Sequence, residues 1–183
     1  MTPAHPDWQR LTQAVAARQR PIVEGLAEFL RHDTVTQNPD GVRAGAHWLI
    51  EAMRSRGLTA EVLETGGNPA VYGALPLPGA RRTVLIYCHY DTKPAPPAGW
   101  LQPSPFVPVL RRGTAEDGAP VLELGQVPDH LLTEHRLYGR GSSDDKGPIW
   151  AHLTALELMR AQGIAPRVNL KLIFDGEEET GSQ

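Results

Sequence analysis

Three clusters of charged residues, spread along the 183-residue chain, carry side chains that could bind a metal ion. Glu177, Glu178 and Glu179 stand in a row near the C-terminus, and His89-Tyr90-Asp91 and Asp144-Asp145-Lys146 lie upstream. Adjacent carboxylates repel one another, and a cation between them would offset that repulsion. We therefore expect the three clusters to converge on one metal site.

The first cluster predicts a histidine ligand and its supporting carboxylate. In an extended backbone, residues i and i+2 point the same way, so His89 and Asp91 can face one site. Imidazole is a common zinc ligand, and a carboxylate that accepts its other N–H fixes the tautomer. Cys88 points to the opposite face, which favours a thiol in the core. Taken alone, His89 is more simply explained as a surface histidine on a loop.

The other two clusters predict carboxylate ligands and a general base. Asp144 follows a glycine-containing loop and comes at or just before a predicted helix, where the helix dipole favours an anion. Helix capping would explain a single aspartate there, whereas one carboxylate bridging two cations explains a pinned acidic pair. In the glutamate run, one side chain could bind metal while its neighbour takes a proton from water. A solvated acidic turn is the competing interpretation.

The intervening sequence predicts an α/β domain with a mixed, twisted sheet flanked by helices. Thr83 to Cys88 is almost unbroken apolar sequence, which predicts a strand covered on both faces. Each cluster follows a strand or opens a helix, and in such sheets ligand sites gather beyond the carboxyl ends of the strands. The predicted helices are 11–30 (in two parts around Pro21), 41–56 and 145–162; the predicted strands are 60–63, 70–75, 83–88, 137–138 and 168–174, with a hairpin of 107–110 and 121–124.

Composition restricts the possible partners. The formal charge is −3 and no long basic run occurs, so no nucleic-acid partner is expected. No apolar run is long enough to span a bilayer, so no membrane partner is expected either. Cys88 is the single cysteine, which excludes an intrachain disulfide and fits a reducing, cytoplasmic setting.

Together and in this order, three motifs resemble those of the co-catalytic zinc metallopeptidases, a family that includes nonspecific dipeptidase, carnosinase, carboxypeptidase G and succinyl-diaminopimelate desuccinylase. The similarity spans nearly the whole chain and is greatest to the dipeptidase and carnosinase branch. The motifs are His89-Tyr90-Asp91-Thr92, residues 137–148 with Asp144-Asp145-Lys146-Gly147-Pro148, and Gly176-Glu177-Glu178-Glu179-Thr180-Gly181-Ser182.

The resemblance implies a role for each matching residue. His89 would bind one zinc ion, Asp144 would bridge two, and Glu179 would bind the second. Glu178 would be the general base and Asp91 would support His89, while Glu177 matches a variable position. The Asp144–Asp145 peptide bond would be cis. Zinc is the implied metal, although a mixed histidine and carboxylate site also accepts manganese or cobalt.

The resemblance also implies that residues 1–183 are the N-terminal portion of a catalytic domain. Relatives carry a later acidic ligand, a late histidine ligand and an inserted lid domain for substrate binding and dimerisation. Without these, each zinc would lack one protein ligand and the sheet would have an uncovered edge and face. The intact parent is expected to be a homodimer acting on small peptides or acyl-amino acids.

Three interpretations of function follow. The first is a dipeptidase, favoured by the Pro-rich loop and the Asp-Asp-Lys-Gly-Pro run. The second is an N-acyl-amino-acid deacylase or desuccinylase that uses the same metal site. The third is a catalytically incompetent fragment that binds metal weakly or pairs with a separate C-terminal half.

Overall fold

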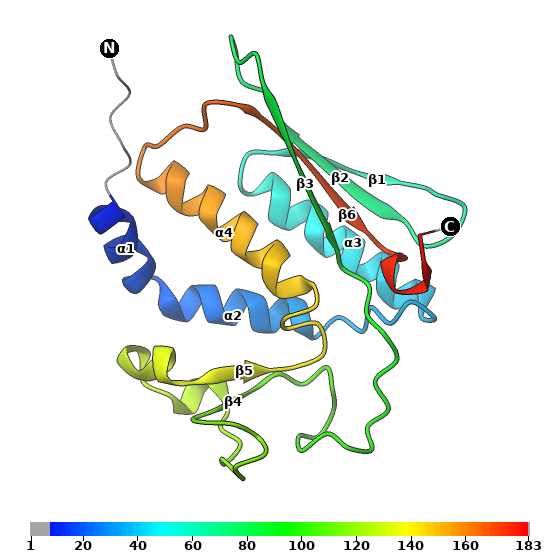
Figure 1. Ribbon diagram of the computed structural model, residues 1–183, viewed down its shortest axis with the longest axis vertical. Coiled ribbons are helices and arrows are strands. Elements are labelled where there is room, and N and C mark those ends of the chain that lie inside the picture. Colours follow the sequence, from blue (N-terminus) through cyan, green and yellow to red (C-terminus); the bar gives the residue numbers. More distant parts are fainter. Residues whose placement is uncertain (1–7, 183) are drawn as a thin grey trace.

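A four-stranded mixed sheet forms the frame on which the three clusters are carried (Figure 1). The computed structural model describes residues 8–182. The strand order is β1 (Thr59–Leu63), β2 (Ala70–Leu75), β6 (Asn169–Asp175) and β3 (Thr83–His89). β2 pairs antiparallel with β1 and with β6, whereas β3 pairs parallel with β6. The predicted mixed sheet is confirmed.

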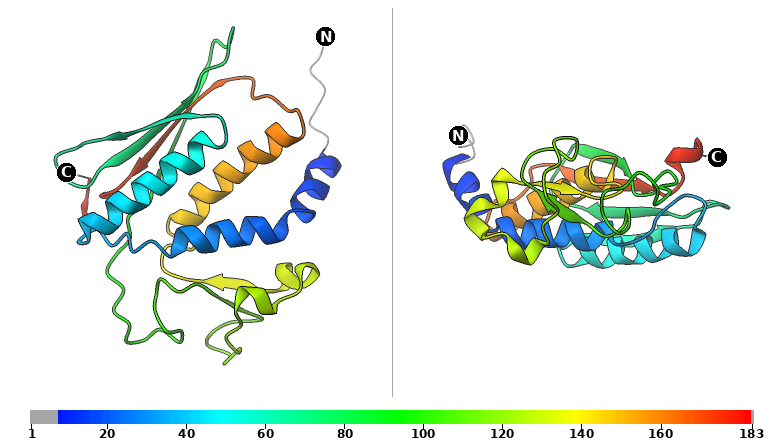
Figure 2. Two further views of the ribbon diagram at one scale, coloured as in Figure 1. Left: turned by 180° about the vertical axis from the view of Figure 1, so that it is seen from behind. Right: turned by 90° about the horizontal axis from the view of Figure 1, so that it is seen from below.

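Helices cover one face of this sheet (Figure 2). α3 (Pro39–Arg54) packs on β1 and β2, and α4 (Lys146–Ala161) packs on β3. α2 (Gln19–Leu30) and the short α1 (Trp8–Ala16) lie against α4. Asn38 caps α3 by accepting a hydrogen bond from the Gly41 amide at 3.2 Å. The shared core is apolar and contains Phe29, Leu49, Met53, Val71, Ile149, Leu153, Leu172 and Phe174.

The predicted hairpin of 107–110 with 121–124 is wrong except for one bridge. Leu110 and Leu122 exchange two backbone hydrogen bonds of 2.9 Å. β4 (Val109–Arg111) otherwise pairs with β5 (Arg136–Tyr138). The chain between them forms two short 3-10 helices, η1 (Leu124–Gln126) and η2 (Asp129–Glu134). Leu110 packs there with Val127 and Leu132, so the apolar residues of this segment are buried in a small separate cluster.

Strand β3 is not covered on both faces, so that expectation is wrong for the described residues. β3 lies at the edge of the sheet, and the helices cover one face. Leu85 is 58% exposed and Tyr87 is 55% exposed. The apolar run of residues 83–88 therefore predicted the strand correctly, but it predicted the burial of the strand's second face wrongly.

An exposed apolar edge strand favours self-association, and we expect Leu85→Glu to reduce it in the 183-residue chain. Leu85 lies opposite Lys171 in the parallel pair, so the new carboxylate gains an opposite charge across the strands. Size-exclusion chromatography with light scattering over a concentration series measures the effect. Thr83→Glu adds the same charge on β3 without removing an apolar side chain, and an equal gain in monomer there would contradict the apolar explanation.

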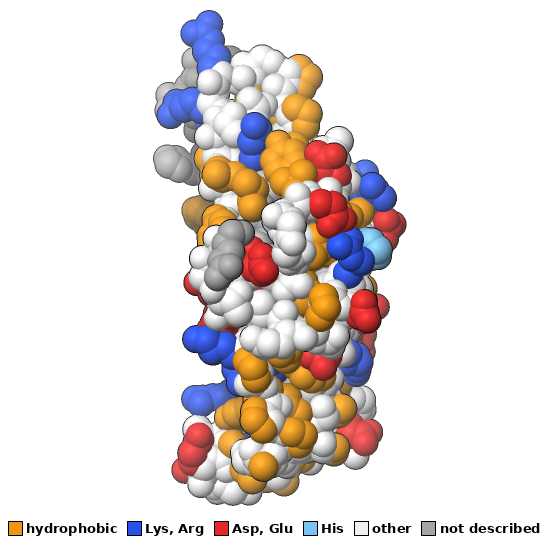
Figure 3. Space-filling model, turned by 90° about the vertical axis from the view of Figure 1, so that its right-hand side faces the viewer, with side chains coloured by type: hydrophobic (Ala, Val, Ile, Leu, Met, Phe, Trp, Pro, Cys, Tyr) orange, Lys and Arg blue, Asp and Glu red, His pale blue; other side chains and the backbone are white. Residues whose placement is uncertain are grey.

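The surface does not segregate one sign of charge on the flank shown in Figure 3. Lys and Arg side chains lie among Asp and Glu side chains, and apolar side chains gather at the lower end and in the upper part of this face (Figure 3). Such a flank lacks the basic stripe that would follow a phosphate backbone. Among the helices of residues 8–182, none has the length and apolar character needed to cross a membrane.

Candidate metal and catalytic site

Parallel pairing brings the first and third clusters together. β3 and β6 run side by side in the same direction, and their last paired residues are His89 and Asp175. The loops that follow both strands therefore leave the sheet at the same edge. Residues 90–92 continue from β3, and η3 (Glu178–Thr180) follows β6. The second cluster arrives from the start of α4, which packs on β3.

His89 lies between the carboxylates of all three clusters. Its Nε2 atom is 2.9 Å from Asp144 Oδ1 and 3.8 Å from Glu178 Oε2. Its Nδ1 atom is 3.2 Å from the Asp91 carbonyl oxygen and 3.3 Å from Asp91 Oδ1. The i, i+2 prediction for His89 and Asp91 is confirmed as geometry. Asp91 holds one ring nitrogen and leaves the other facing Asp144.

The surrounding carboxylates make His89 a strong base. Burial of the ring lowers its pKa, but the hydrogen bond and charge of Asp91 and the hydrogen bond to Asp144 outweigh burial and raise the pKa to about 9. The imidazole is therefore protonated at neutral pH in this metal-free arrangement. A metal ion binding at Nε2 has to displace that proton.

Asp91 joins the first cluster to the third. Its side chain is fully buried. Oδ1 accepts a hydrogen bond from the Glu178 amide at 3.2 Å, and Oδ2 accepts one from the Glu179 amide at 3.1 Å. The Thr36 hydroxyl donates to Oδ2 at 2.9 Å. Asp91 thus orients the glutamate turn as well as His89, which extends the supporting role predicted for it.

The aspartate pair divides two tasks. The Asp144–Asp145 peptide bond is cis, as the resemblance implies. Asp145 occupies the N-cap position of α4, but its side chain makes no capping hydrogen bond and instead accepts from the His89 amide at 3.2 Å. Asp144 faces His89 Nε2 and is 74% exposed. Helix capping therefore does not account for either side chain.

The three glutamates point to three different surroundings. The Glu179 carboxylate is only 9% exposed and lies 3.1 Å from Lys93 Nζ. Glu178 is 43% exposed beside His89. The Glu177 carboxylate lies against Gly67. A Cβ atom at position 67 would be only 2.4 Å from Glu177 Oε1. The solvated-turn interpretation therefore fails for Glu179, and Glu177 lies apart from the site.

The donor atoms suit a divalent metal ion, although their arrangement in the described residues is incomplete. One imidazole nitrogen and several carboxylate oxygens form a mixed set of the kind that zinc binds. Cations already neutralise these carboxylates, namely protonated His89 and the Lys93 ammonium. Within residues 8–182, however, no three His, Cys, Asp or Glu side chains stand in a coordinating arrangement. In that same range Glu179 forms an ion pair with Lys93 and none with His89.

Sequence reasoning missed several residues of this site. Thr36 reaches Asp91 from a segment that reads only as a loop, and no sequence signal identified it. Lys93 follows the first motif and Lys146 lies within the second, but sequence reasoning assigned no role to either lysine. Lys146 is fully buried, and burial lowers its pKa to about 7, partly opposed by the charge of Asp33. Cys88 behaves as predicted: it is buried, and burial first and then the charge of Asp145 raise its pKa to about 12.

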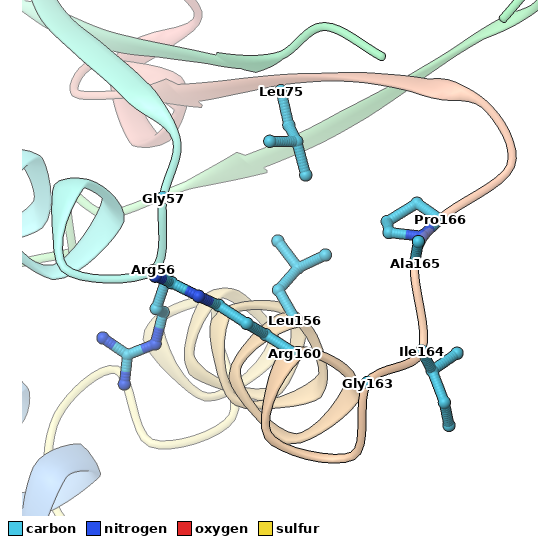
Figure 4. Close-up of a pocket in the computed structure, with 9 residues that line it drawn as sticks. All are labelled: Arg56, Gly57, Leu75, Leu156, Arg160, Gly163, Ile164, Ala165 and Pro166. Atoms are coloured by element: carbon cyan, nitrogen blue, oxygen red, sulfur yellow. The ribbon is translucent and has the colours of Figure 1, made fainter. Parts of the chain in front are cut away.

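A separate hollow lies away from these residues. It has a volume of about 490 Å³ and is open between the end of α4 and the sheet (Figure 4). Leu75, Leu156 and Ile164 supply apolar walls, and the Arg160 side chain extends toward Gly57 (Figure 4). Among residues 8–182, no carboxylate, imidazole or thiol lines it. The hollow therefore offers no chemistry that competes with the site around His89.

Comparison with known proteins points to one family. The sequence model of peptidase family M20/M25/M40 matches residues 85–183. The Cys-Gly metallodipeptidase of Candida albicans is 32% identical over 150 residues, which are 75% of this chain and 27% of that protein. The human Beta-Ala-His dipeptidase is 34% identical over 115 residues, 62% of this chain and 18% of that protein. The chain thus spans less than a third of the length of these curated relatives.

Solved structures agree with the sequence comparison. A metallo-carboxypeptidase of the M20 family from Sulfolobus solfataricus superposes with a TM-score of 0.68 at 31% identity, covering 88% of this chain and 32% of that chain. Human carnosine dipeptidase 1 gives a TM-score of 0.76 at 24% identity and covers 98% of this chain and 36% of that chain. The second likeness establishes the fold alone.

Proposed function

The chain belongs to peptidase family M20/M25/M40, and from that premise we propose that it is the N-terminal part of the catalytic domain of a metal-dependent dipeptidase. One observation carries the proposal: His89 Nε2 lies within 2.9 Å of Asp144 and 3.8 Å of Glu178. Three distant segments thus supply the ligand types and a free carboxylate that such hydrolysis needs. The polypeptide that contains this part is called the full-length gene product below.

His89, Asp144 and Glu179 are the proposed metal-binding residues, with zinc as the metal and manganese or cobalt as substitutes. His89 offers Nε2, because Asp91 engages the other ring nitrogen. Asp144 is 74% exposed, and its carboxylate would be shared between the ions. Glu179 would exchange its Lys93 partner for metal. When bound, zinc lowers the pKa of water and polarises the scissile carbonyl.

Glu178 is the proposed general base. Its carboxylate is 43% exposed, so water and substrate can reach it, while the Asp91 carboxylate fixes its backbone amide. Glu178 takes a proton from the attacking water and later delivers a proton to the leaving amine. Asp91 does not exchange protons in this scheme. It holds His89 and the glutamate turn in position relative to each other.

Small dipeptides are the proposed substrates. The support is the activity of similar proteins, a Cys-Gly metallodipeptidase and two Beta-Ala-His dipeptidases among them. The test is a panel of Cys-Gly, β-Ala-His and N-acetylated amino acids, incubated with the zinc-loaded full-length gene product and followed by amine release. Faster cleavage of the free dipeptides is expected. Preference for the acylated amino acids would replace the proposal with a deacylase.

The extent of the domain has a separate test. Residues 1–183 are proposed to lack later ligands and a lid domain that the rest of the polypeptide supplies. The reading frame downstream of codon 183 should encode a further acidic ligand and a late histidine. The full-length gene product should elute as a homodimer in size-exclusion chromatography. A stop codon directly after Gln183 would contradict this assignment.

Zinc binding to the metal-free full-length gene product should release about one proton at pH 7.5, because the pKa of His89 is about 9 and its ligand form is neutral. Apparent zinc affinity should therefore rise roughly tenfold per pH unit below pH 9 and flatten above it. Calorimetry in two buffers with different ionisation enthalpies counts the protons. A pH-independent affinity between pH 6 and pH 8 would argue against His89 as a ligand.

A further inference from the structure

Lys146 is a buried lysine that the proposed chemistry does not use. Its side chain is fully buried and reaches from the start of α4 to the end of α2. Nζ donates to the His32 carbonyl at 2.7 Å and to the Phe29 carbonyl at 3.3 Å. It also lies 5.1 Å from the centre of the Phe29 ring. Both carbonyls stand at the end of α2, where Phe29 O also accepts from the His32 amide at 3.3 Å and His32 O from the Thr34 amide at 3.0 Å.

The chain just after these carbonyls holds the His89–Asp91 loop. We call residues 32–36 the strap. The Thr34 hydroxyl donates to the Tyr90 carbonyl at 2.7 Å, and the Thr34 carbonyl accepts from the Thr92 amide at 2.9 Å. The Thr36 amide donates to the Thr92 carbonyl at 3.0 Å, and its hydroxyl donates to Asp91. The strap thus fixes the backbone on both sides of Asp91.

The loop that carries Asp144 is closed at Lys146 and lies against the side chain of the same lysine at Gly141. The Lys146 amide donates to the Gly141 carbonyl at 3.0 Å and closes the loop. Gly141 has a φ of +81°, and a Cβ on it would lie 3.1 Å from Lys146 Cδ. Asp144 lies inside this closed loop. Its position therefore follows that of Lys146.

We propose that Lys146 is a positioning residue that sets the distance between Asp144 and the His89–Asp91 loop, and thereby the affinity for metal, without touching a metal-binding side chain. The connection runs from Asp144 through Lys146 to His32, and along the strap to Asp91. An ammonium or an amine can donate to both carbonyls, so the role does not depend on the ionisation of Lys146. The proposal rests on the proposed metal site.

The test compares two variants of the full-length gene product at the same helix interface. Lys146→Met keeps a long unbranched side chain and removes both hydrogen bonds. Trp150→Phe removes a similar bond between α4 and α2, from Trp150 Nε1 to the Ile22 carbonyl at 2.7 Å, and this carbonyl lies outside both the strap and the loop of Asp144. Zinc affinity is measured by competition with a chromophoric chelator, and Tm by circular dichroism of the metal-free protein.

Lys146→Met should weaken zinc binding by about 10- to 100-fold, the range found for outer partners of metal ligands. Trp150→Phe should lower Tm and leave the zinc Kd unchanged. Should Lys146→Met fail to fold, Thr36→Val removes the strap's hydroxyl bond to Asp91 in an isosteric way and should also weaken zinc binding. A wild-type zinc Kd in folded Lys146→Met, or an equal loss in Trp150→Phe, would overturn the proposal.

The same samples separate this proposal from the proposed function. Wild-type protein that binds zinc but cleaves no dipeptide would refute the dipeptidase assignment and leave the zinc comparison intact. Wild-type protein that cleaves dipeptides, with an unchanged zinc Kd in Lys146→Met, would refute the positioning role alone.

Discussion

Glu178→Gln in the full-length gene product is expected to lower kcat by roughly 100- to 10,000-fold while zinc remains bound, because glutamine cannot accept a proton. The side chain keeps its size, and the backbone amide of residue 178 keeps its hydrogen bond to Asp91. The turn should therefore keep its shape. Initial rates of dipeptide cleavage and elemental analysis of the dialysed protein measure the two quantities separately.

Glu177→Gln is the matched control for that substitution. It makes the same chemical change one residue earlier, on a carboxylate that faces Gly67 rather than His89. Its kcat and zinc content should stay at the wild-type values. Full activity in Glu178→Gln would remove Glu178 from the mechanism, and equal losses in both variants would mean that the acidic turn acts only through its overall charge.

The sequence predicted the sheet well because its strands differ in period and composition from the helices. The run from Val168 to Phe174 could be recognised as a strand, and it is β6, between β2 and β3. Exposure was harder to predict. Residues 83–88 are apolar whether the second face of the strand is covered or open, since burial depends on which elements lie opposite, and local sequence does not encode that.

The site was predicted as a set of residue types and only partly as a set of contacts. The alternation of a strand is enough to bring His89 and Asp91 to one side, and that contact is confirmed. The contacts of Asp91 with the glutamate turn depend on the parallel pairing of β3 with β6. This pairing brings together residues that lie about 87 positions apart in the sequence. No local pattern records such a pairing.

The lysines show a second limit of sequence reasoning. Sequence reasoning assigned no role to Lys146, which is fully buried and donates to carbonyls at the end of α2. Lys93 is exposed and pairs with Glu179. The two could not be distinguished before their surroundings were known, because the fate of a long amphipathic side chain depends on tertiary packing.

Asp144→Asn is expected to abolish stable zinc binding in the full-length gene product, with a larger loss than the roughly 10- to 100-fold typical of outer partners of metal ligands. The amide keeps the shape of the side chain but removes the charge that faces His89 Nε2 at 2.9 Å. Both proposed ions would lose their shared ligand. Zinc content after dialysis and the zinc Kd measure the loss.

The metal-free form of the same variant gives an independent reading. Hydrogen bonding to Asp144 is one of the causes that raise the pKa of His89, so Asp144→Asn should lower that pKa from about 9 without restoring it fully, because Asp91 still acts on the ring. Histidine NMR titration of the metal-free protein measures this directly.

Asp117→Asn, in a loop where Asp117 pairs with Thr114, is the matched control and should change neither zinc binding nor the titration of His89. If Asp144→Asn retains zinc at the wild-type level, Asp144 does not bridge the ions, and its contact with His89 is a feature of the metal-free chain alone.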